Sequence, residues 1–199
     1  MAGTKRKKGK SLVSFPSDYC VIDIETTGLE PESCEIIEIA AVRYRDFKKE
    51  DVFTTLIKPS RKINSFITSL TGITNDMVKD APGISEAIQR FSEFAGDDIL
   101  MGYNVNFDLN FLYDALLKCH GKHLGNDYVD VVRFARAALP QLPDRKQTSV
   151  AAYYDISVKG AHRAEKDCEI CNGCYLHLIK EESVIAFAQS KTKNKQKES

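Results

Sequence analysis

The chain has 199 residues, of which 43% are hydrophobic and 28% charged, a balance typical of a folded globular protein. At this length we expect one domain with a substantial core. No apolar run is long enough to span a bilayer, and no apolar segment follows the basic N-terminus as in a secretory signal. Six cysteines in such a chain are typical of reduced thiols. We therefore expect a cytoplasmic protein without a membrane partner.

The formal charges cancel, but they are unevenly distributed. Residues 1–10 hold five basic residues and no acid, and residues 191–199 hold four basic residues and one acid, which leaves 19 basic and 27 acidic residues between them. Two interpretations stay open: the ends make loose contacts with a polyanion, or they are simply solvated. We predict a disordered basic arm over 1–17, a folded domain over 18–182 and a polar, basic tail over 183–199.

Three strands open the predicted domain. An apolar run over 19–25 forms the first strand, and a β-branched segment over 35–46 forms the second. The charged residues 47–50 suggest a hairpin turn, and the third strand follows over 51–58, closed by Pro59. Because these connections are short, the three strands should form an antiparallel meander.

Strands and helices alternate in the rest of the domain. Hydrophobic periodicity and turn residues predict helical turns near 65–70 and 74–78, helices over 84–94, 107–119, 131–138, 148–154 and 164–180, and strands over 98–103 and 128–131. Asn106 is the predicted N-cap of the second of these long helices. The pattern predicts a mixed α/β fold, in which helices cover both faces of a five-stranded sheet.

Asp23 and Glu25 stand at the end of the first strand, where they share one face of the sheet. Acidic residues are poor strand formers. A divalent cation such as Mg²⁺ or Mn²⁺ would explain the pair, because hard carboxylate oxygens are its preferred ligands. An ordinary strand end with two solvated acids is the alternative.

Three further residues add to this pair. Asp108 and Asp167 each lie in the first turn of a predicted helix, where an acid also complements the helix dipole. His162 lies on a loop just before the second of these helices, and histidine suits proton removal near neutral pH. A surface histidine is the simpler interpretation. Taken together, four carboxylates and one histidine are typical of a two-metal phosphodiesterase site.

Three segments resemble the motifs of the DEDDh exonucleases, the DnaQ-like family typified by the proofreading epsilon subunit of bacterial DNA polymerase III. They are Asp23-Ile-Glu-Thr-Thr-Gly28, Asn104-Val-Asn-Phe-Asp108 and His162-Arg-Ala-Glu-Lys-Asp167. Each is short, but their order and spacing are specific, and the resemblance covers residues 18–180. The segment 70–74 also resembles the family's substrate loop.

The resemblance implies a ribonuclease-H-like fold with two Mg²⁺ or Mn²⁺ ions. The implied metal ligands are Asp23, Glu25, Asp108 and Asp167, and the implied general base is His162. The same resemblance implies that the terminal nucleotide contacts His162 and seven further residues, namely Thr26, Thr27, Leu29, Leu70, Thr71, Asn104 and Phe107.

The function implied by the resemblance is metal-dependent 3′→5′ hydrolysis of single-stranded nucleic acid, preferably DNA, to nucleoside 5′-monophosphates in proofreading or repair. Such a protein would be associated with the nucleoid. Two alternatives stay open. One is an RNA exonuclease, because discrimination of the 2′-hydroxyl depends on details of the pocket. The other is a non-catalytic adaptor that binds nucleic acid through its basic ends.

A DNA polymerase and a sliding clamp are the protein partners that the resemblance suggests. The segment 147–151 faintly resembles a clamp-binding peptide, but helix capping and core packing explain it better. Only about twenty mostly polar residues follow the predicted last helix. This is a departure from the epsilon subunit, whose C-terminal extension binds the polymerase.

Overall fold

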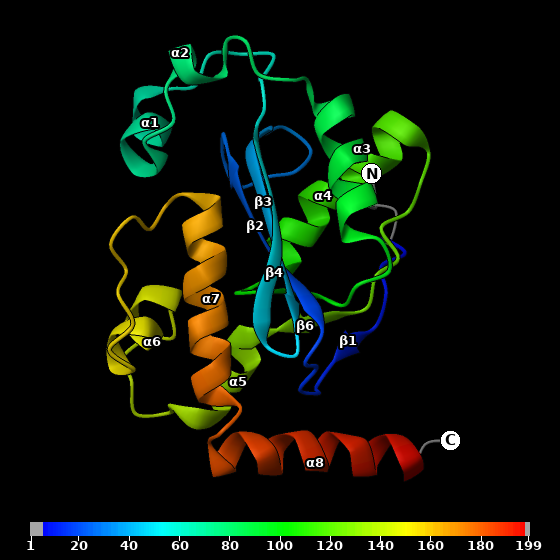
Figure 1. Ribbon diagram of the computed structural model, residues 1–199, viewed down its shortest axis with the longest axis vertical. Helices are drawn as coiled ribbons and strands as arrows, with labels where there is room; N and C mark the ends of the chain where they lie inside the picture. The colour runs from blue at the N-terminus through cyan, green and yellow to red at the C-terminus, as the bar shows by residue number, and fades with distance from the viewer. Residues whose placement is uncertain (1–5, 198–199) are drawn as a thin grey trace.

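A mixed six-stranded sheet forms the centre of the molecule in the computed structural model, which describes the backbone of residues 6–197 and the side chains of residues 6–191 (Figure 1). The strand order is β1-β6-β5-β2-β3-β4; β2, β3 and β4 pair antiparallel, and the other neighbours pair parallel. The predicted meander is therefore confirmed. The strands are β1 (Ser11–Leu12), β2 (Tyr19–Thr26), β3 (Ile36–Arg45), β4 (Lys48–Leu56), β5 (Leu100–Gly102) and β6 (Tyr128–Asp130).

The hairpin between β3 and β4 is tighter than predicted. Asp46 and Phe47 both have positive φ angles, 49° and 60°, as in the two-residue turns that match the twist of paired strands. The prediction that β4 begins at Asp51 is therefore wrong: charged residues 48–50 are exposed but belong to the strand. Charge alone suggested a turn there, although a solvent-facing edge strand accepts charged side chains equally well.

The N-terminal segment differs from the predicted disordered arm. Ser11 and Leu12 pair in parallel with β6 and form the sixth strand, which the sequence analysis missed. Before them, the Arg6 guanidinium donates to both carboxylate oxygens of Asp114, at 2.7 and 2.6 Å. The Lys10 amide donates to Asp127 at 2.6 Å. These contacts cover the open edge of β6; the predicted arm residues 1–5 lie outside the described residues.

Helices cover both faces of the sheet, as predicted. α3 and α4 pack on one face, α5, α6 and α7 lie on the other, and α1 and α2 form a lobe beside the end of the sheet (Figure 1). Within the described residues none of these helices has the length and apolar character needed to cross a membrane. The helices are α1 (Ser65–Thr71), α2 (Asn75–Val78), α3 (Ile84–Ala95), α4 (Asn106–His120), α5 (Val131–Ala138), α6 (Gln147–Tyr153), α7 (Ala164–Leu178) and α8 (Glu182–Lys197).

Three details of the helices correct the predictions. The cap of α4 is Val105 rather than Asn106, and α6 starts one residue before its predicted start, with Lys146 as its cap. The predicted polar tail begins as a helix, because α8 buries Val184 against the rest of the domain and packs on α5.

The alternation of side chains along β2 places the site on one face of the sheet. Tyr19 and Val21 pack into the core beneath α7, whereas Cys20 and Ile22 pack beneath α3 and α4. Because successive side chains alternate, Asp23 and Glu25 continue the row on the α7 side. The central strand therefore carries two carboxylates toward the N-terminus of α7.

Candidate active site

Asp23 and Glu25 lie half-buried near the end of β2. In the pairing with β3, Asp23 is opposite Ala40, and Glu25 is opposite Glu38. The two acids therefore lie on one face of the sheet, as predicted.

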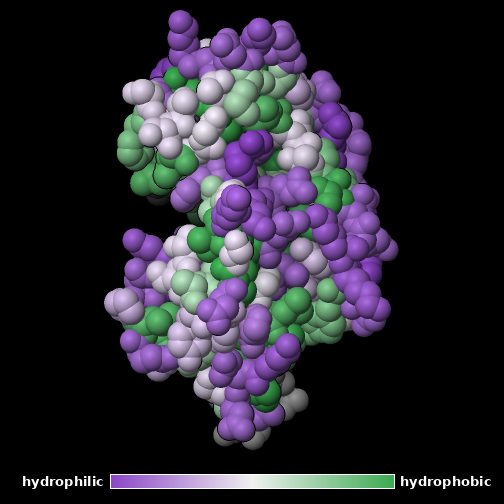
Figure 2. All heavy atoms as spheres, turned by 60° about the vertical axis from the view of Figure 1, so that its left-hand side comes forward, coloured by the Kyte–Doolittle hydropathy of each residue, from purple (hydrophilic) through white to green (hydrophobic). Residues whose placement is uncertain are grey.

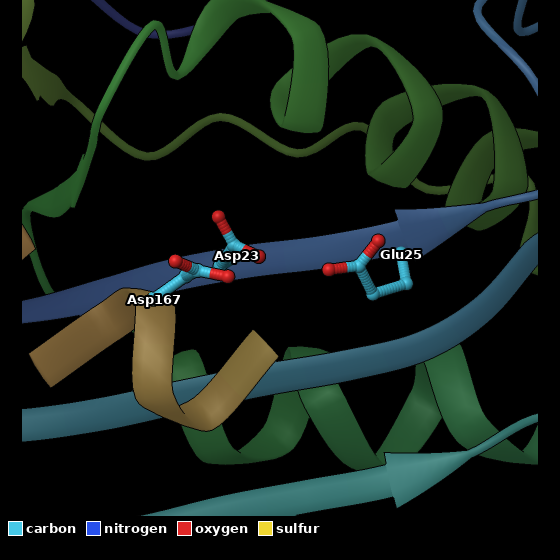
Figure 3. Close-up of side chains that lie close together, drawn as sticks. All are labelled: Asp23, Glu25 and Asp167. Carbon is cyan, nitrogen blue, oxygen red and sulfur yellow. The ribbon is translucent and has the colours of Figure 1, made fainter. Parts of the chain in front are cut away.

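Asp167 joins this pair from the first turn of α7. One carboxylate oxygen from each of Asp23, Glu25 and Asp167 lies within 4.8 Å of the other two. Figure 3 shows the carboxylates of Asp23 and Asp167 side by side, with Glu25 further along the strand. Segments more than 140 residues apart in the sequence thus meet at one point.

Asp108 reaches the same region through the turn between β5 and α4. A β-carbon on Gly102 would lie 2.7 Å from Val105 Cγ2 and 3.0 Å from the Ile22 carbonyl oxygen, so this tight turn beside β2 favours glycine. Asn104 has a φ of 60°, and its amide donates to Asp130 at 2.9 Å. The chain then enters α4, where the buried Asp108 accepts a hydrogen bond from the Ile24 amide at 3.1 Å. Asp108 therefore sits beside the group of three acids and is fixed to β2.

A cleft of about 350 Å³ contains all five predicted catalytic residues. Figure 2 shows the molecule hollowed on this side, between the α1–α2 lobe and the part formed by α6 and α7. The predicted nucleotide contacts Asn104 and Phe107 also line it. The complete lining is Asp23, Ile24, Glu25, Tyr103, Asn104, Phe107, Asp108, Lys146, Gln147, Thr148, His162 and Asp167.

The other predicted nucleotide contacts lie outside this lining. Thr26 and Thr27 use their hydroxyls within the turn, since Thr26 donates to the Gly28 carbonyl and Thr27 accepts from the Glu35 amide. The hydroxyl of the buried Thr71 is engaged within α1 and its C-terminal turn. Only Leu29 and Leu70 present exposed side chains, 76% and 45% accessible. The contact of these five residues with a nucleotide stays a prediction.

His162 has an unusual backbone conformation at the end of the loop before α7. Its φ angle is 67°, in the left-handed region that residues with a β-carbon rarely adopt. Its amide donates to Asp167 Oδ2 at 2.8 Å, and its exposed side chain lines the cleft. The backbone of the histidine thus holds a carboxylate, while its imidazole is exposed at the cleft.

Five residues that were not predicted as site residues also line the cleft, namely Ile24, Tyr103, Lys146, Gln147 and Thr148. Gln147 Nε2 donates to the Asp167 carbonyl at 3.0 Å and lies 3.3 Å from Asp167 Oδ1. Lys146 is exposed beside it, and the Tyr103 hydroxyl donates to the Arg145 carbonyl. The segment 147–151 was predicted to serve helix capping and core packing, with a faint resemblance to a clamp-binding peptide. Its later residues, Val150 and Ala151, are buried, which agrees with core packing.

The carboxylates of the site raise one another's pKa values. Burial is the main cause for Asp23, whose pKa lies well above its usual range, and the charges of Asp108 and Asp167 add to it. Burial, followed by the charges of Asp167 and Glu38, raises the pKa of Glu25 to about 7. The pKa values of Asp108 and Asp167 are also raised by burial, although hydrogen bonds from backbone amides oppose this.

These residues fit a divalent metal ion. Hard oxygen donors gathered within 4.8 Å are what Mg²⁺ and Mn²⁺ prefer, and a cation would relieve the repulsion that raises the pKa values. The cysteines of α7 do not compete for such an ion, because Cys168, Cys171 and Cys174 are buried in the core.

Comparison with known proteins places this chain in a family. Residues 20–175 match the family described as Exonuclease (RNase_T). The PolC-type DNA polymerase III of Caldanaerobacter subterraneus subsp. tengcongensis is 36% identical over 171 residues, which cover 86% of this chain. The matched part is 12% of that polymerase, so the chain corresponds to a small portion of its relative.

Solved exonucleases share the fold. A zinc-bound complex of Escherichia coli exonuclease I with single-stranded DNA superposes with a TM-score of 0.73 at 18% identity, covering 86% of this chain and 42% of that one. Exonuclease X in complex with a 5′-overhanging duplex superposes with a TM-score of 0.67 at 24% identity, covering 81% and 91%. At these identities the likeness concerns the fold, and it confirms the predicted ribonuclease-H-like architecture.

Proposed function

The chain belongs to the Exonuclease (RNase_T) family, and from this premise we propose that it is a metal-dependent 3′→5′ exonuclease acting on single-stranded DNA. The observation that carries the proposal is the meeting of Asp23, Glu25 and Asp167 in one cleft with Asp108 and His162. A carboxylate cluster beside a free imidazole suits hydrolysis of a phosphodiester better than any role in structure alone.

The carboxylates would hold the metal ions. The carboxylates of Asp23, Glu25 and Asp167 lie close together, and Asp108 lies beside them in the same cleft. Two Mg²⁺ or Mn²⁺ ions would supply activation of a water and stabilisation of the leaving oxygen. His162 takes the proton from the attacking water, and nucleoside 5′-monophosphates are the products.

The remaining residues of the cleft would bind the end of the strand. Phe107 offers a half-buried ring on which a base can stack, and Asn104 is exposed beside it. The exposed Leu29 and Leu70 would contact the terminal bases, and the ammonium group of Lys146 would contact a phosphate. DNA is the favoured substrate, because the relative is a DNA polymerase III and both structural neighbours hold DNA. A polymerase or a sliding clamp would be the associated protein, in proofreading or repair.

Asp23→Asn tests the proposal most directly. The change keeps the size of the side chain and removes one charge from the group of three. Loss of metal binding should cost about 4 kcal/mol of transition-state stabilisation, or about a thousandfold in rate. The assay follows degradation of oligonucleotides labelled at the 5′ end, with Mg²⁺ or Mn²⁺. Asp46→Asn, in the exposed β3–β4 turn, is the matched control and should keep full activity.

The same assay examines polarity and substrate. A phosphorothioate linkage at the 3′ end should block degradation, whereas one at the 5′ end should not. Matched RNA oligonucleotides should be degraded more slowly than DNA; the reverse order would favour an RNA exonuclease. Full activity of Asp23→Asn would contradict the assignment of the site. Metal-independent binding without any hydrolysis would favour the adaptor alternative.

A further inference from the structure

Glu38 is a buried carboxylate near the start of β3, and its hydrogen-bond partners come from the C-terminal part of the chain. Its side chain is 3% exposed, and it lies opposite Glu25 in the sheet. Glu38 Oε1 accepts from Arg163 Nη2 at 2.7 Å, and Arg163 Nε lies 3.2 Å from both carboxylate oxygens. The Ala164 amide donates to Glu38 Oε2 at 3.0 Å. Both oxygens of Glu38 are therefore engaged by groups of the protein.

These partners directly follow His162. The loop between α6 and α7 is exposed over residues 157–160, and it ends in His162, Arg163 and the start of α7. The His162 amide is bound by Asp167, and the next two residues are bound by Glu38. Among the described residues, the hydrogen bonds that join residues 161–164 to the sheet all end on Glu38.

A histidine with a φ of 67° needs such support. The left-handed conformation is disfavoured for residues with a β-carbon, and it persists where neighbouring contacts hold it. Arg163 supplies a rigid, planar fork that matches the carboxylate of Glu38. This fork and the Ala164 amide fix the residues on the C-terminal side of His162, so they set where its imidazole stands relative to the carboxylates of the cleft.

We propose that Glu38 and Arg163 are positioning residues, which hold the His162 loop against the sheet so that the imidazole stays over the carboxylate cluster. The inference rests on the proposed exonuclease function, in which His162 takes the proton of the attacking water.

Two other roles for the pair lead to different outcomes. Arg163 could simply neutralise a buried acid, in which case its loss would lower stability without acting through His162. Its side chain is also 46% exposed, so it could instead contact a phosphate of the substrate, in which case its loss would raise KM.

A double-mutant cycle between Arg163→Gln and His162→Ala separates these roles. In the wild-type background, Arg163→Gln should lower kcat about tenfold or more and leave KM within about threefold. In the His162→Ala background, it should cause less than about a twofold further loss, because the two residues act as one unit. Equal losses in both backgrounds, or a change in KM alone, would overturn the proposal.

Two additions keep the cycle decisive. Arg90→Gln is the matched control, because Arg90 pairs with Glu86 on the surface of α3 and should leave kcat unchanged. Where Arg163→Gln fails to fold, Arg163→Lys takes its place in the same cycle. Lysine keeps the charge and loses the fork, so it should lower kcat about threefold or more in the wild-type background alone.

A measurement without turnover separates this inference from the proposed function. The heteronuclear ¹H–¹⁵N NOE of the His162 amide should fall in Arg163→Gln and stay unchanged in Arg90→Gln, as expected for a loop that has lost its attachment. An unchanged NOE in Arg163→Gln would overturn the positioning role even in an active enzyme. Absence of hydrolysis by the wild-type protein would instead contradict the proposed function, whatever the NOE shows.

Discussion

Glu25→Gln should stabilise the metal-free protein at alkaline pH and leave it unchanged at acidic pH. In the folded protein the pKa of Glu25 is raised from 4.5 to about 7, mainly by burial and then by the charges of Asp167 and Glu38. Between these two values the folded state binds more protons than the unfolded state. The free energy of unfolding therefore falls as pH rises from about 4.5 to about 7, and the loss is complete above that range.

The size of the effect follows from the same pKa. A rise from 4.5 to about 7 corresponds to about 3 kcal/mol of unfavourable interaction of the ionised form. Glutamine has nearly the same volume and no charge, so the variant should recover most of this energy at pH 8. For a chain of this length about 3 kcal/mol corresponds to a rise in Tm of about 6–12 °C. Well below pH 4.5, the carboxyl is protonated in both states, and the difference should vanish.

The assay is thermal and denaturant unfolding of both proteins in EDTA, at about pH 3.5 and at pH 8. Glu86→Gln is the control, because the Glu86 side chain is 64% exposed on α3. Among the described residues, its ion-pair partner is Arg90. Its effect should stay below about 0.5 kcal/mol at both pH values. A Glu25→Gln variant that is no more stable than wild type at pH 8 would refute the electrostatic argument.

A divalent cation should remove the difference between the two proteins. Binding of Mn²⁺ to the folded state alone stabilises the wild type by about 2.7 kcal/mol at a hundred times Kd. The variant keeps fewer charged ligands and should gain less at the same concentration. Repeating the pH 8 measurement with Mn²⁺ should therefore close the gap that EDTA reveals. A gap that persists unchanged would show that the cluster does not bind this ion.

Two further predictions concern the neighbours of the cluster. His162→Ala should reduce the rate about 10²–10⁴-fold while the Mn²⁺-induced rise in Tm is retained, because the residue acts on water rather than as a ligand; loss of the Tm rise would contradict this division of roles. Gln147→Leu keeps the size of the side chain and removes the hydrogen bonds to Asp167, so it should weaken Mn²⁺ binding about tenfold in a Tm titration. Unchanged Mn²⁺ affinity of that variant would mean that Asp167 is oriented by other contacts.

The parts of the fold that the sequence predicted are those governed by local periodicity. The alternation along residues 19–25 placed Asp23 and Glu25 on one face, and β2 has that arrangement. The apolar positions of the last predicted helix, from Ala164 onward, are buried in α7. What was missed depends on distant partners: β1 has two residues, and it exists because β6 offers an open edge.

The same distinction applies to the candidate site. The order and spacing of the sequence motifs predicted that the acids lie close together, and the structure brings Asp23, Glu25 and Asp167 together. Glu38 gave no signal, because it stands in a β-branched run like an ordinary strand residue and its partner is 125 residues away. Gln147 was likewise not predicted as a site residue, because its hydrogen-bond partner Asp167 lies on another helix.

The carboxylate cluster is tolerated because rigid elements hold its members. Asp23 and Glu25 extend from β2, which is paired on both sides, and each face of that strand rests on a separate apolar core. Asp108 is fixed by the Ile24 amide, and Asp167 by the His162 amide. The cost of burying these charges, to which their repulsion adds, therefore appears as raised pKa values rather than as displaced side chains. Removing one charge should for this reason stabilise the metal-free fold, whereas an element free to move would have relieved the repulsion by itself.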